Sequence, residues 1–265
     1  MLKIKNVRKV FNAGTINEKV ALDGLNLELK EGDFVTVIGG NGAGKSTMLN
    51  CVSGLYSVDD GSILIDGMDV TKLAEHKRAK YIGRVFQDPM MGTAATMQIE
   101  ENLALAARRG KPRLLGPGIT KKEREQYREQ LKILDLGLED RMTAKVGLLS
   151  GGQRQALTLL MATLQKPKLL LLDEHTAALD PKTADKVLEA TERIVQESGL
   201  TTMMITHNMR DAIAHGNRLV MMYNGRVVVD VSGEEKKNLT VEQLLSLFSQ
   251  ASGSDEVDDK LVLSK

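Results

Sequence analysis

A glycine-rich segment that follows a short apolar run restricts the fold of this chain more than any other feature of its sequence. The run FVTVI at residues 34–38 precedes the segment, and the helix-compatible run MLNCVSG follows it. The segment itself reads Gly39, Gly40, Asn41, Gly42, Ala43, Gly44, Lys45, Ser46 and Thr47. It fits the pattern G-x-x-x-x-G-K-[ST] in the required setting, between a strand and a helix. We therefore expect a phosphate-binding loop, because a plain chain-reversing turn would not need four glycines followed by Lys-Ser-Thr.

The residue types of this loop define its chemistry. Glycines allow successive backbone N–H groups and the helix N-terminus to face phosphate oxygens. Lys45 adds a positive charge, and Ser46 adds a hard oxygen of the kind that Mg²⁺ prefers. The loop thus predicts a site for a nucleotide together with Mg²⁺.

Short apolar runs rich in β-branched residues or Leu recur along the chain. They lie at residues 34–38, 169–172, 203–206, 219–222 and 227–229, with helical patterns between several of them. This alternation predicts an α/β fold with a mostly parallel, buried sheet. Looser alternation at residues 2–10, 25–29 and 63–67 predicts an antiparallel flank beside that sheet.

The middle of the chain differs in texture, because residues 89–165 lack β-branched runs and predict an inserted helical subdomain. A loop at 110–118 interrupts this region, and Thr120 with Glu123 then forms the pattern of a capping box.

The clearest helical pattern runs over residues 181–197, with Asp180 as its N-cap and Pro181 as its first residue. We expect a single domain over residues 1–265. Its parts are an α/β core with the flank at 1–88 and 166–232, the helical subdomain at 89–165, and a C-terminal helix with a mobile tail at 233–265.

Two carboxylates, Asp173 and Glu174, directly follow the apolar run 169–172. A strand this apolar is buried, so the two charges lie at the carboxyl edge of the sheet, where α/β proteins bind ligands. Beside a phosphate loop, Asp173 is expected to hold Mg²⁺ and Glu174 to orient or deprotonate an attacking water. The alternative is that both side chains simply leave the core for solvent, which the upstream phosphate loop disfavours.

A second helix start also has the composition of an anion site. Ser150 and Gln153 have the spacing of a capping box, and Gly151 and Gly152 stand between them. Each glycine costs about 1 kcal/mol relative to Ala in a helix, so an ordinary helix cap does not explain the pair. Close approach of a ligand to the backbone would explain it. The chain would then have two helix N-termini that bind phosphate, whereas a single nucleotide at Lys45 requires only one.

Composition excludes several classes of function. The chain has 36 Lys+Arg and 35 Asp+Glu, a net charge of +1, with 3% aromatic residues and no Trp, which disfavours nucleic acid as a partner. A lone cysteine, Cys51, excludes an intrachain disulfide and a multi-cysteine metal cage. No uncharged stretch reaches the roughly 18 residues of a membrane-spanning helix, so we expect any membrane span to belong to a separate chain.

The motifs and their order resemble the ATP-binding subunit of an ABC transporter over residues 2–232. That resemblance implies a P-loop NTPase core of the RecA-like type and the hydrolysis of ATP with Mg²⁺. It identifies residues 39–47 as the Walker A loop, Asp173 as the Walker B carboxylate, Glu174 as the catalytic carboxylate, and residues 149–153 as the signature sequence.

The resemblance also assigns roles to four further residues, each of which has a plainer structural explanation. It implies that Phe11 stacks on adenine, although the family more often has Tyr there and Phe11 could be a core aromatic. It makes Gln87 the catalytic glutamine of the Q-loop, which reaches both the metal shell and the helical insertion; otherwise Gln87 could be just a polar loop residue. The resemblance places Asp180 in the D-loop, although Asp180 could be only a helix cap. It makes His207 the switch histidine, a hydrogen-bond partner of the γ-phosphate, although His207 could be only a strand-end residue.

In this family, two such domains pack head to tail, so that each ATP lies between the Walker A loop of one and the signature of the other. The resemblance therefore implies a homodimer, a separate membrane permease, and a location at the cytoplasmic face of the cell membrane. An extracytoplasmic substrate-binding protein is a further candidate partner. Uptake of small solutes, amino acids among them, is the leading function. A soluble ABC ATPase of the iron–sulfur assembly type is the alternative.

Two local features complete the expectations. The family usually has Pro after the catalytic glutamate, where this chain has His175; its ring either modulates Glu174 or, as we favour, leaves the chemistry unchanged. The segment 88–97 is poor in charge and rich in Met and small residues, which predicts a groove for a permease helix. The alternative for this segment is a buried link between subdomains.

Overall fold

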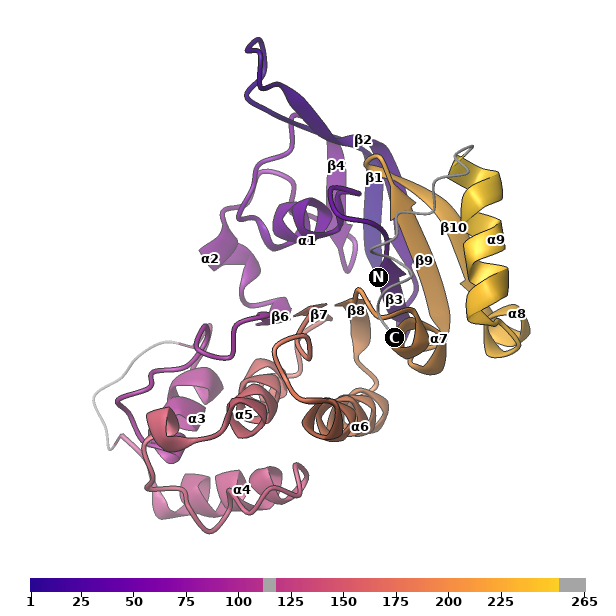
Figure 1. Cartoon of the computed structure of the whole chain (residues 1–265). Helices are drawn as coiled ribbons and strands as arrows, with labels where there is room; N and C mark the ends of the chain where they lie inside the picture. The colour runs from indigo at the N-terminus through magenta and orange to yellow at the C-terminus, as the bar shows by residue number, and fades with distance from the viewer. Residues whose placement is uncertain (112–117, 253–265) are drawn as a thin grey trace.

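The computed structural model describes residues 1–111 and 118–252, and two β-sheets form its centre (Figure 1). The larger sheet has the strand order β10-β9-β3-β8-β7-β6. Its strands are β3 (Phe34–Ile38), β6 (Ile82–Val85), β7 (Leu169–Asp173), β8 (Thr201–Ile205), β9 (Arg218–Tyr223) and β10 (Arg226–Ser232). All neighbours pair in parallel except β9 and β10, which form an antiparallel hairpin. The prediction of a mostly parallel sheet is confirmed.

The smaller sheet is antiparallel throughout and has the order β2-β1-β4-β5. Its strands are β1 (Leu2–Phe11), β2 (Lys19–Leu29), β4 (Asp60–Ile65) and β5 (Met68–Asp69). The antiparallel flank is thus confirmed, but β2 begins six residues before the predicted Leu25. Register shifts along β1 and β2 break the period of two, which hides the first half of β2 in the sequence.

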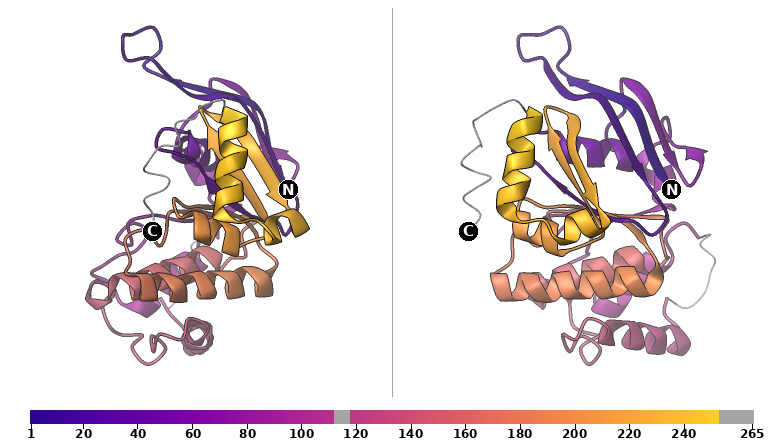
Figure 2. Two further views of the ribbon diagram at one scale, coloured as in Figure 1. Left: turned by 45° about the vertical axis from the view of Figure 1, so that its right-hand side comes forward. Right: turned by 90° about the vertical axis from the view of Figure 1, so that its right-hand side faces the viewer.

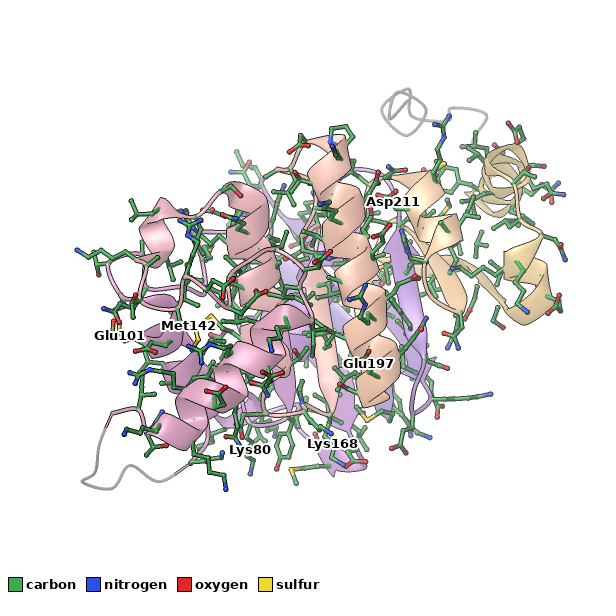
Figure 3. The ribbon with its side chains drawn as sticks, turned by 90° about the horizontal axis from the view of Figure 1, so that it is seen from below. Lys80, Glu101, Met142, Lys168, Glu197 and Asp211 are labelled. Carbon is green, nitrogen blue, oxygen red and sulfur yellow. The ribbon has the colours of Figure 1, made fainter. Side chains whose placement is uncertain are left out.

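Helices cover both faces of the larger sheet (Figure 2). Helix α1 (Lys45–Ser53) lies between the two sheets, and α3 (Ile99–Ala107), α4 (Lys121–Lys132), α5 (Gly151–Thr163) and α6 (Pro181–Ser198) lie on the other side. Seen from that side, α6 and the 89–165 region cover the strands (Figure 3). The remaining elements are α2 (Glu75–Arg78), the 3₁₀ turn η1 (Val146–Leu148), α7 (Met209–Ala214), α8 (Gly233–Lys237) and α9 (Val241–Ser252). The predicted loop falls largely on residues 112–117, and the predicted tail on 253–265, which lie outside the described residues.

Strand β7 shows why its sequence is apolar at every position. Leu169 and Leu171 pack into the core around α1 and the smaller sheet. Leu170 and Leu172 pack into the core formed with α3 to α6. Both faces of this strand are therefore buried, and its carboxyl end is the first place where a polar side chain can stand.

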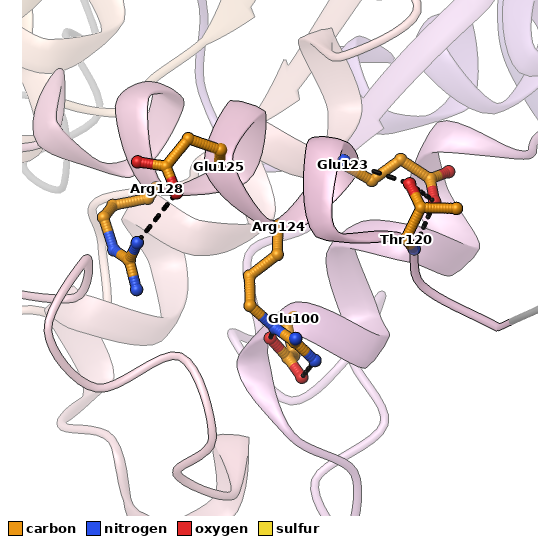
Figure 4. A network of polar contacts seen from close by, with 6 residues as sticks. All are labelled: Glu100, Thr120, Glu123, Arg124, Glu125 and Arg128. Atoms are coloured by element: carbon orange, nitrogen blue, oxygen red, sulfur yellow. Dashed lines mark hydrogen bonds and ion pairs between the residues drawn. The ribbon is translucent and has the colours of Figure 1, made fainter.

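A polar network joins helices α3 and α4 in the helical region (Figure 4). Arg124 donates to both carboxylate oxygens of Glu100, over 2.6 and 2.8 Å, and this pairing lowers the pKa of Glu100. At the start of α4, Thr120 and Glu123 form the predicted capping box. The insertion thus has a rigid connection between its first two helices, independent of the sheet.

Candidate nucleotide site

The phosphate loop curls between β3 and α1, and glycine is required at its two ends. Gly39 and Gly44 have φ angles of +151° and +103°, a region that other residues rarely adopt. A Cβ at Gly39 would lie 2.3 Å from the Met222 carbonyl oxygen, and one at Gly44 would lie 2.6 Å from that of Ala21. The close approach of neighbouring backbone is therefore part of the loop's geometry.

Lys45 is the first residue of α1 and is only 8% exposed. Its ammonium group donates to the carbonyl oxygens of Gly39, over 2.6 Å, and Gly40, over 3.2 Å. Burial lowers the pKa of Lys45, and the nearby carboxylates of Glu174 and Asp173 oppose that shift. The charge is thus held inside the curl of the loop.

A cavity of about 200 Å³ lies against this loop. It is lined by Phe11, Lys19, Ala21, Glu174 and the loop residues 40–47. Phe11 is half-buried at the cavity wall, and its ring also packs edge-on against Tyr56, with the centroids 5.3 Å apart. Lys19 escaped the sequence analysis, because no motif marks an exposed lysine that the β1–β2 hairpin brings to the loop.

The two carboxylates stand at the end of β7, as predicted. Burial raises the pKa of Asp173, and Arg84, whose Nη2 lies 3.3 Å from Oδ2, opposes this shift. Glu174 follows with a φ angle of +45°, a backbone conformation that strains a non-glycine residue and that persists most often at functional sites. Its Oε2 lies 3.7 Å from Nδ1 of His207.

Glu174 borders a second cavity as well, of about 210 Å³. His207, Asn208 and Asp211 line this cavity together with several residues of the 176–185 segment. Glu174 therefore lies between the phosphate loop on one side and His207 on the other. The sequence alone could not place His207 beside Glu174, because the contact follows from the parallel pairing of β7 with β8.

The donor set fits Mg²⁺ delivered with a nucleotide. Within residues 1–111 and 118–252, no cluster of three or more His, Cys, Asp or Glu side chains could hold a metal ion by itself. The Ser46 hydroxyl is exposed at the start of α1, and the Asp173 carboxylate stands at the end of β7. Mg²⁺ commonly binds one or two such oxygens and completes its shell with phosphate oxygens and water.

Gln87 is exposed and lines neither cavity. The residue before it, Phe86, accepts a hydrogen bond of 2.9 Å from Gln155 of α5 through its backbone carbonyl. The Q-loop is thus attached to the signature helix rather than to the phosphate loop.

The signature segment starts α5 with the expected capping box. Ser150 accepts from the backbone of Gln153, whose side chain accepts in turn from Ser150 N. A Cβ at Gly152 would lie 2.0 Å from Thr183 Cγ2 on α6, whereas one at Gly151 would meet only Leu179, at 3.4 Å. Close contact with α6 therefore accounts for Gly152 within a single chain, whereas no contact of this kind accounts for Gly151.

None of the signature residues 149–153 lines the two cavities beside Glu174. Ser150 and Gly151 are exposed at the helix N-terminus. Asp180 is exposed too, and its side chain caps α6 by accepting from Thr183 N over 3.1 Å. A single copy of the chain thus presents these residues at its surface, apart from its own phosphate loop.

His175 points into the protein and lines neither cavity. It is 2% exposed, and its Nε2 lies 3.2 Å from Thr191 Oγ1 on α6. Burial lowers the pKa of His175 to about 4, so the ring is neutral at pH 7. This placement supports the interpretation that His175 leaves the chemistry of Glu174 unchanged.

None of the helices in the described part of the chain has the length and apolar character that crossing a membrane requires.

Comparisons with known proteins agree with this geometry. The family model described as "ABC transporter" matches residues 22–177. The tyrosine transport ATP-binding protein of Clostridioides difficile is 46% identical over 251 residues, which cover 95% of this chain and 100% of that protein. The methionine import ATP-binding protein MetN of Halalkalibacterium halodurans is 37% identical, over 91% of this chain and 71% of that protein.

Solved structures show the same fold. A dimeric ATP-binding cassette in a post-hydrolysis state, bound to ADP and Pi, superimposes with a TM-score of 0.74 at 31% identity. The match covers 88% of this chain and 98% of that cassette. Fold, motifs and relatives agree, and the chain belongs to the ATP-binding subunits of the ABC transporter family, which hydrolyse ATP.

Proposed function

We propose that this chain drives the uptake of an amino acid through a separate membrane permease, with tyrosine as the leading solute. One observation carries the catalytic part: Glu174 lines the cavity of the phosphate loop and also faces His207 at 3.7 Å. The solute rests on the 46% identity to a tyrosine transport ATP-binding protein over nearly the whole chain. The iron–sulfur assembly alternative is not favoured, because the curated relatives are named for transport.

In this proposal, the residues of the loop bind the phosphates of ATP. Lys45 and the N–H groups of residues 40–47 neutralise the β- and γ-phosphates, and Phe11 at the cavity wall stacks on the adenine. Ser46 and Asp173 would hold Mg²⁺, with Gln87 reaching its shell when the Q-loop moves inward. The metal would stabilise charge that develops on the phosphate oxygens.

The proton transfer falls to Glu174. Its carboxylate accepts a proton from the attacking water, and the strained backbone fixes the direction of that carboxylate. His207 holds the far side of Glu174 and donates to the γ-phosphate as the reaction proceeds. Glu174 lines both cavities, and His207 lines the second of them.

The signature residues, which a single chain leaves at its surface, are proposed to complete the site of a second copy. Ser150, Gly151 and Gln153 would contact the γ-phosphate bound at the partner's phosphate loop, and Asp180 would contact the partner across the interface. The exposure of Ser150 and Asp180 supports this head-to-tail arrangement.

The permease is proposed to bind an apolar patch formed by Met90, Met91 and Leu148. These side chains are 51, 52 and 72% exposed, unusual values for large apolar residues. Arg154 of α5 contacts the sulfur of Met90 and also donates to the carbonyl oxygens of Gly147 and Leu149, so it ties the two parts of the patch together. Docking there would keep the chain at the cytoplasmic face of the membrane, and an extracytoplasmic substrate-binding protein would deliver the solute.

A negative charge introduced into the apolar patch tests whether the permease binds there. Met91→Glu should abolish co-purification with the permease while leaving ATP binding by the isolated chain intact. Met68→Glu, a matched change at a 44% exposed methionine in β5 of the antiparallel sheet, should co-purify normally. Equal recovery of permease with both variants would contradict the docking patch.

The solute is tested by reconstitution. The tagged chain is purified from its own membranes with the proteins that accompany it, placed in proteoliposomes with ATP, and supplied with radiolabelled tyrosine, methionine or putrescine. We expect ATP-dependent uptake of tyrosine well above that of the other two solutes, and none with Glu174→Gln. Uptake of methionine or putrescine in preference to tyrosine would contradict the assigned solute.

A further inference from the structure

Arg84 belongs to none of the sequence motifs, yet it contacts the two elements that carry the proposed metal ligands. Its Nη2 lies 2.7 Å from Asn50 Oδ1 on α1 and 3.3 Å from Asp173 Oδ2 on β7. Its Nη1 donates to Ser53 Oγ on α1 over 3.2 Å. The guanidinium also lies over the ring of Phe86, 4.6 Å from the centroid.

The position of Arg84 in the sheet makes these contacts possible. Strand β6 pairs in parallel with β7, and Arg84 stands opposite Leu171, two residues before Asp173. From there, a long side chain reaches the carboxyl edge of the sheet beneath α1. The planar fork of arginine presents five N–H donors on separate nitrogens, so it can donate to a carboxylate and to two groups on a neighbouring helix in one fixed geometry.

Both members of the ion pair are largely withdrawn from water, since the side chains of Arg84 and Asp173 are 11 and 17% exposed. A buried charge is expensive unless it is paired and hydrogen-bonded. Asn50 and Ser53 of α1 and Asp173 of β7 supply these partners for Arg84. The positive charge of Arg84 is therefore paired inside the protein and is not a solvated surface charge.

The geometry on α1 connects Arg84 to the metal ligands. Asn50 lies four residues after Ser46, so both side chains are on the same face of the helix. A single nitrogen, Nη2, therefore bridges the helix of Ser46 to the carboxylate of Asp173. It fixes the spacing between the two oxygens on which the proposed Mg²⁺ site depends.

We propose that Arg84 is a positioning residue that holds the Asp173 carboxylate at a set distance from α1, so that Asp173 and Ser46 present their oxygens together to a nucleotide-bound divalent metal. The inference rests on the proposed metal site. Groups that orient a ligating carboxylate typically change metal affinity or activity by about 10- to 100-fold when they are removed.

The test measures metal binding directly, by electron paramagnetic resonance of Mn²⁺ added to the full chain with a non-hydrolysable ATP analogue. Arg84→Met should raise the Mn²⁺ concentration for half-saturation about tenfold. Arg84→Lys keeps the positive charge but loses the planar guanidinium, so it should also raise this Mn²⁺ concentration by at least about threefold. It replaces Arg84→Met in the test if the methionine variant folds poorly. Nucleotide affinity in EDTA should not change.

Arg78 provides a matched control. It is a second buried arginine, 2% exposed, that donates to the carbonyl oxygens of Cys51 and Val52 at the end of α1. Arg78→Met should lower the stability of the fold without changing the Mn²⁺ titration. Identical titrations for the Arg84 and Arg78 variants would overturn the positioning role, because loosening of α1 would then be the only effect.

Asp173→Asn separates this inference from the proposal beneath it. If Asp173→Asn leaves the Mn²⁺ titration unchanged, the metal site itself is wrong, and the inference fails with it. If Asp173→Asn weakens Mn²⁺ binding and the Arg84 variants do not, the metal site stands and only the role of Arg84 is wrong.

Discussion

Two lysines reach the cavity of the phosphate loop, and they differ in how far they are withdrawn from water. Lys45 is 8% exposed and bonded to two loop carbonyls, whereas Lys19 is exposed at the start of β2. Lys45→Ala removes a charge-assisted contact from a buried site, so ATP affinity should fall by roughly 100-fold. Lys19→Ala removes a screened surface charge and should weaken binding only about threefold.

Calorimetric titration with ATP at low and high salt separates these two effects. The loss caused by Lys19→Ala should shrink as salt increases, and the loss caused by Lys45→Ala should persist. Equal losses for the two variants would mean that the loop does not bind phosphate through Lys45.

At the level of single residues, the sequence motifs predicted the phosphate loop and the pair Asp173 and Glu174, because each of these motifs consists of consecutive residues. Arg84 and Lys19 could not be found in this way. Their contacts depend on the pairing of β6 with β7 and on the register of β1 against β2, neither of which leaves a fixed spacing in the sequence.

The start of α5 packs against α6 through a position where only glycine fits. A Cβ at Gly152 would lie 2.0 Å from Thr183 Cγ2, so Gly152→Ala requires the Thr183 side chain or one of the two helices to shift. We expect this change to lower the free energy of unfolding by about 1 to 3 kcal/mol, as overpacking does. Gly151→Ala, with its nearest neighbour at 3.4 Å, is the matched control and should change stability little.

Urea unfolding measures both glycine variants, and adding Thr183→Ala to Gly152→Ala should recover part of the loss. Helix propensity alone would make both alanine variants slightly more stable, because Ala favours a helix more than Gly does. If Gly151→Ala and Gly152→Ala change the free energy of unfolding equally, contact with α6 does not explain Gly152.

Helix α8 carries a buried lysine whose charge is unfavourable in the folded state. Lys236 is 2% exposed, its ammonium donates to the carbonyl oxygens of His215 and Gly216, and burial lowers its pKa to about 8. Between about pH 8 and the unfolded value of 10.5, the unfolded chain binds more protons than the folded chain, so stability rises with pH.

Urea unfolding at pH 7 and pH 10 tests this sign. Relative to Lys236→Met, the wild-type protein should gain about 2 kcal/mol of unfolding free energy over that interval. The comparison with the variant removes the titration of all other groups. A gain of equal size in Lys236→Met would assign the pH dependence to another residue.

Among the elements, the sequence was most informative where both faces of a strand are buried. Strand β7 appears as an unbroken apolar run because its leucines fill two separate cores. Strand β6 was missed, because Gly83 and Arg84 interrupt its short apolar run. The carbonyl oxygen of Ala162 lies too close to Gly83 for a larger residue, and the side chain of Arg84 makes polar contacts beneath α1. Residues selected for tertiary contacts thus obscured the local pattern.

At the scale of the whole molecule, we propose that one chain carries two separate halves of a nucleotide site. The phosphate loop and Glu174 line one cavity, and the signature residues line neither that cavity nor its neighbour. The solved dimeric relative shows that cassettes of this fold can pair. Our account therefore requires that each active site combine the loop of one copy with the signature of another.

The most direct measurement is the complementation of two variants, each on a Glu174→Gln background that binds ATP but slows hydrolysis. Lys45→Ala removes both functional loops from a homodimer, and Ser150→Arg blocks both signatures. A mixed dimer retains one intact site, with the loop of the Ser150→Arg chain and the signature of the Lys45→Ala chain. By light scattering with ATP and Mg²⁺, we expect each variant alone to be monomeric and the equimolar mixture to form dimers. A mixture that stays monomeric while Glu174→Gln alone dimerises, or dimers from either variant by itself, would contradict the shared site.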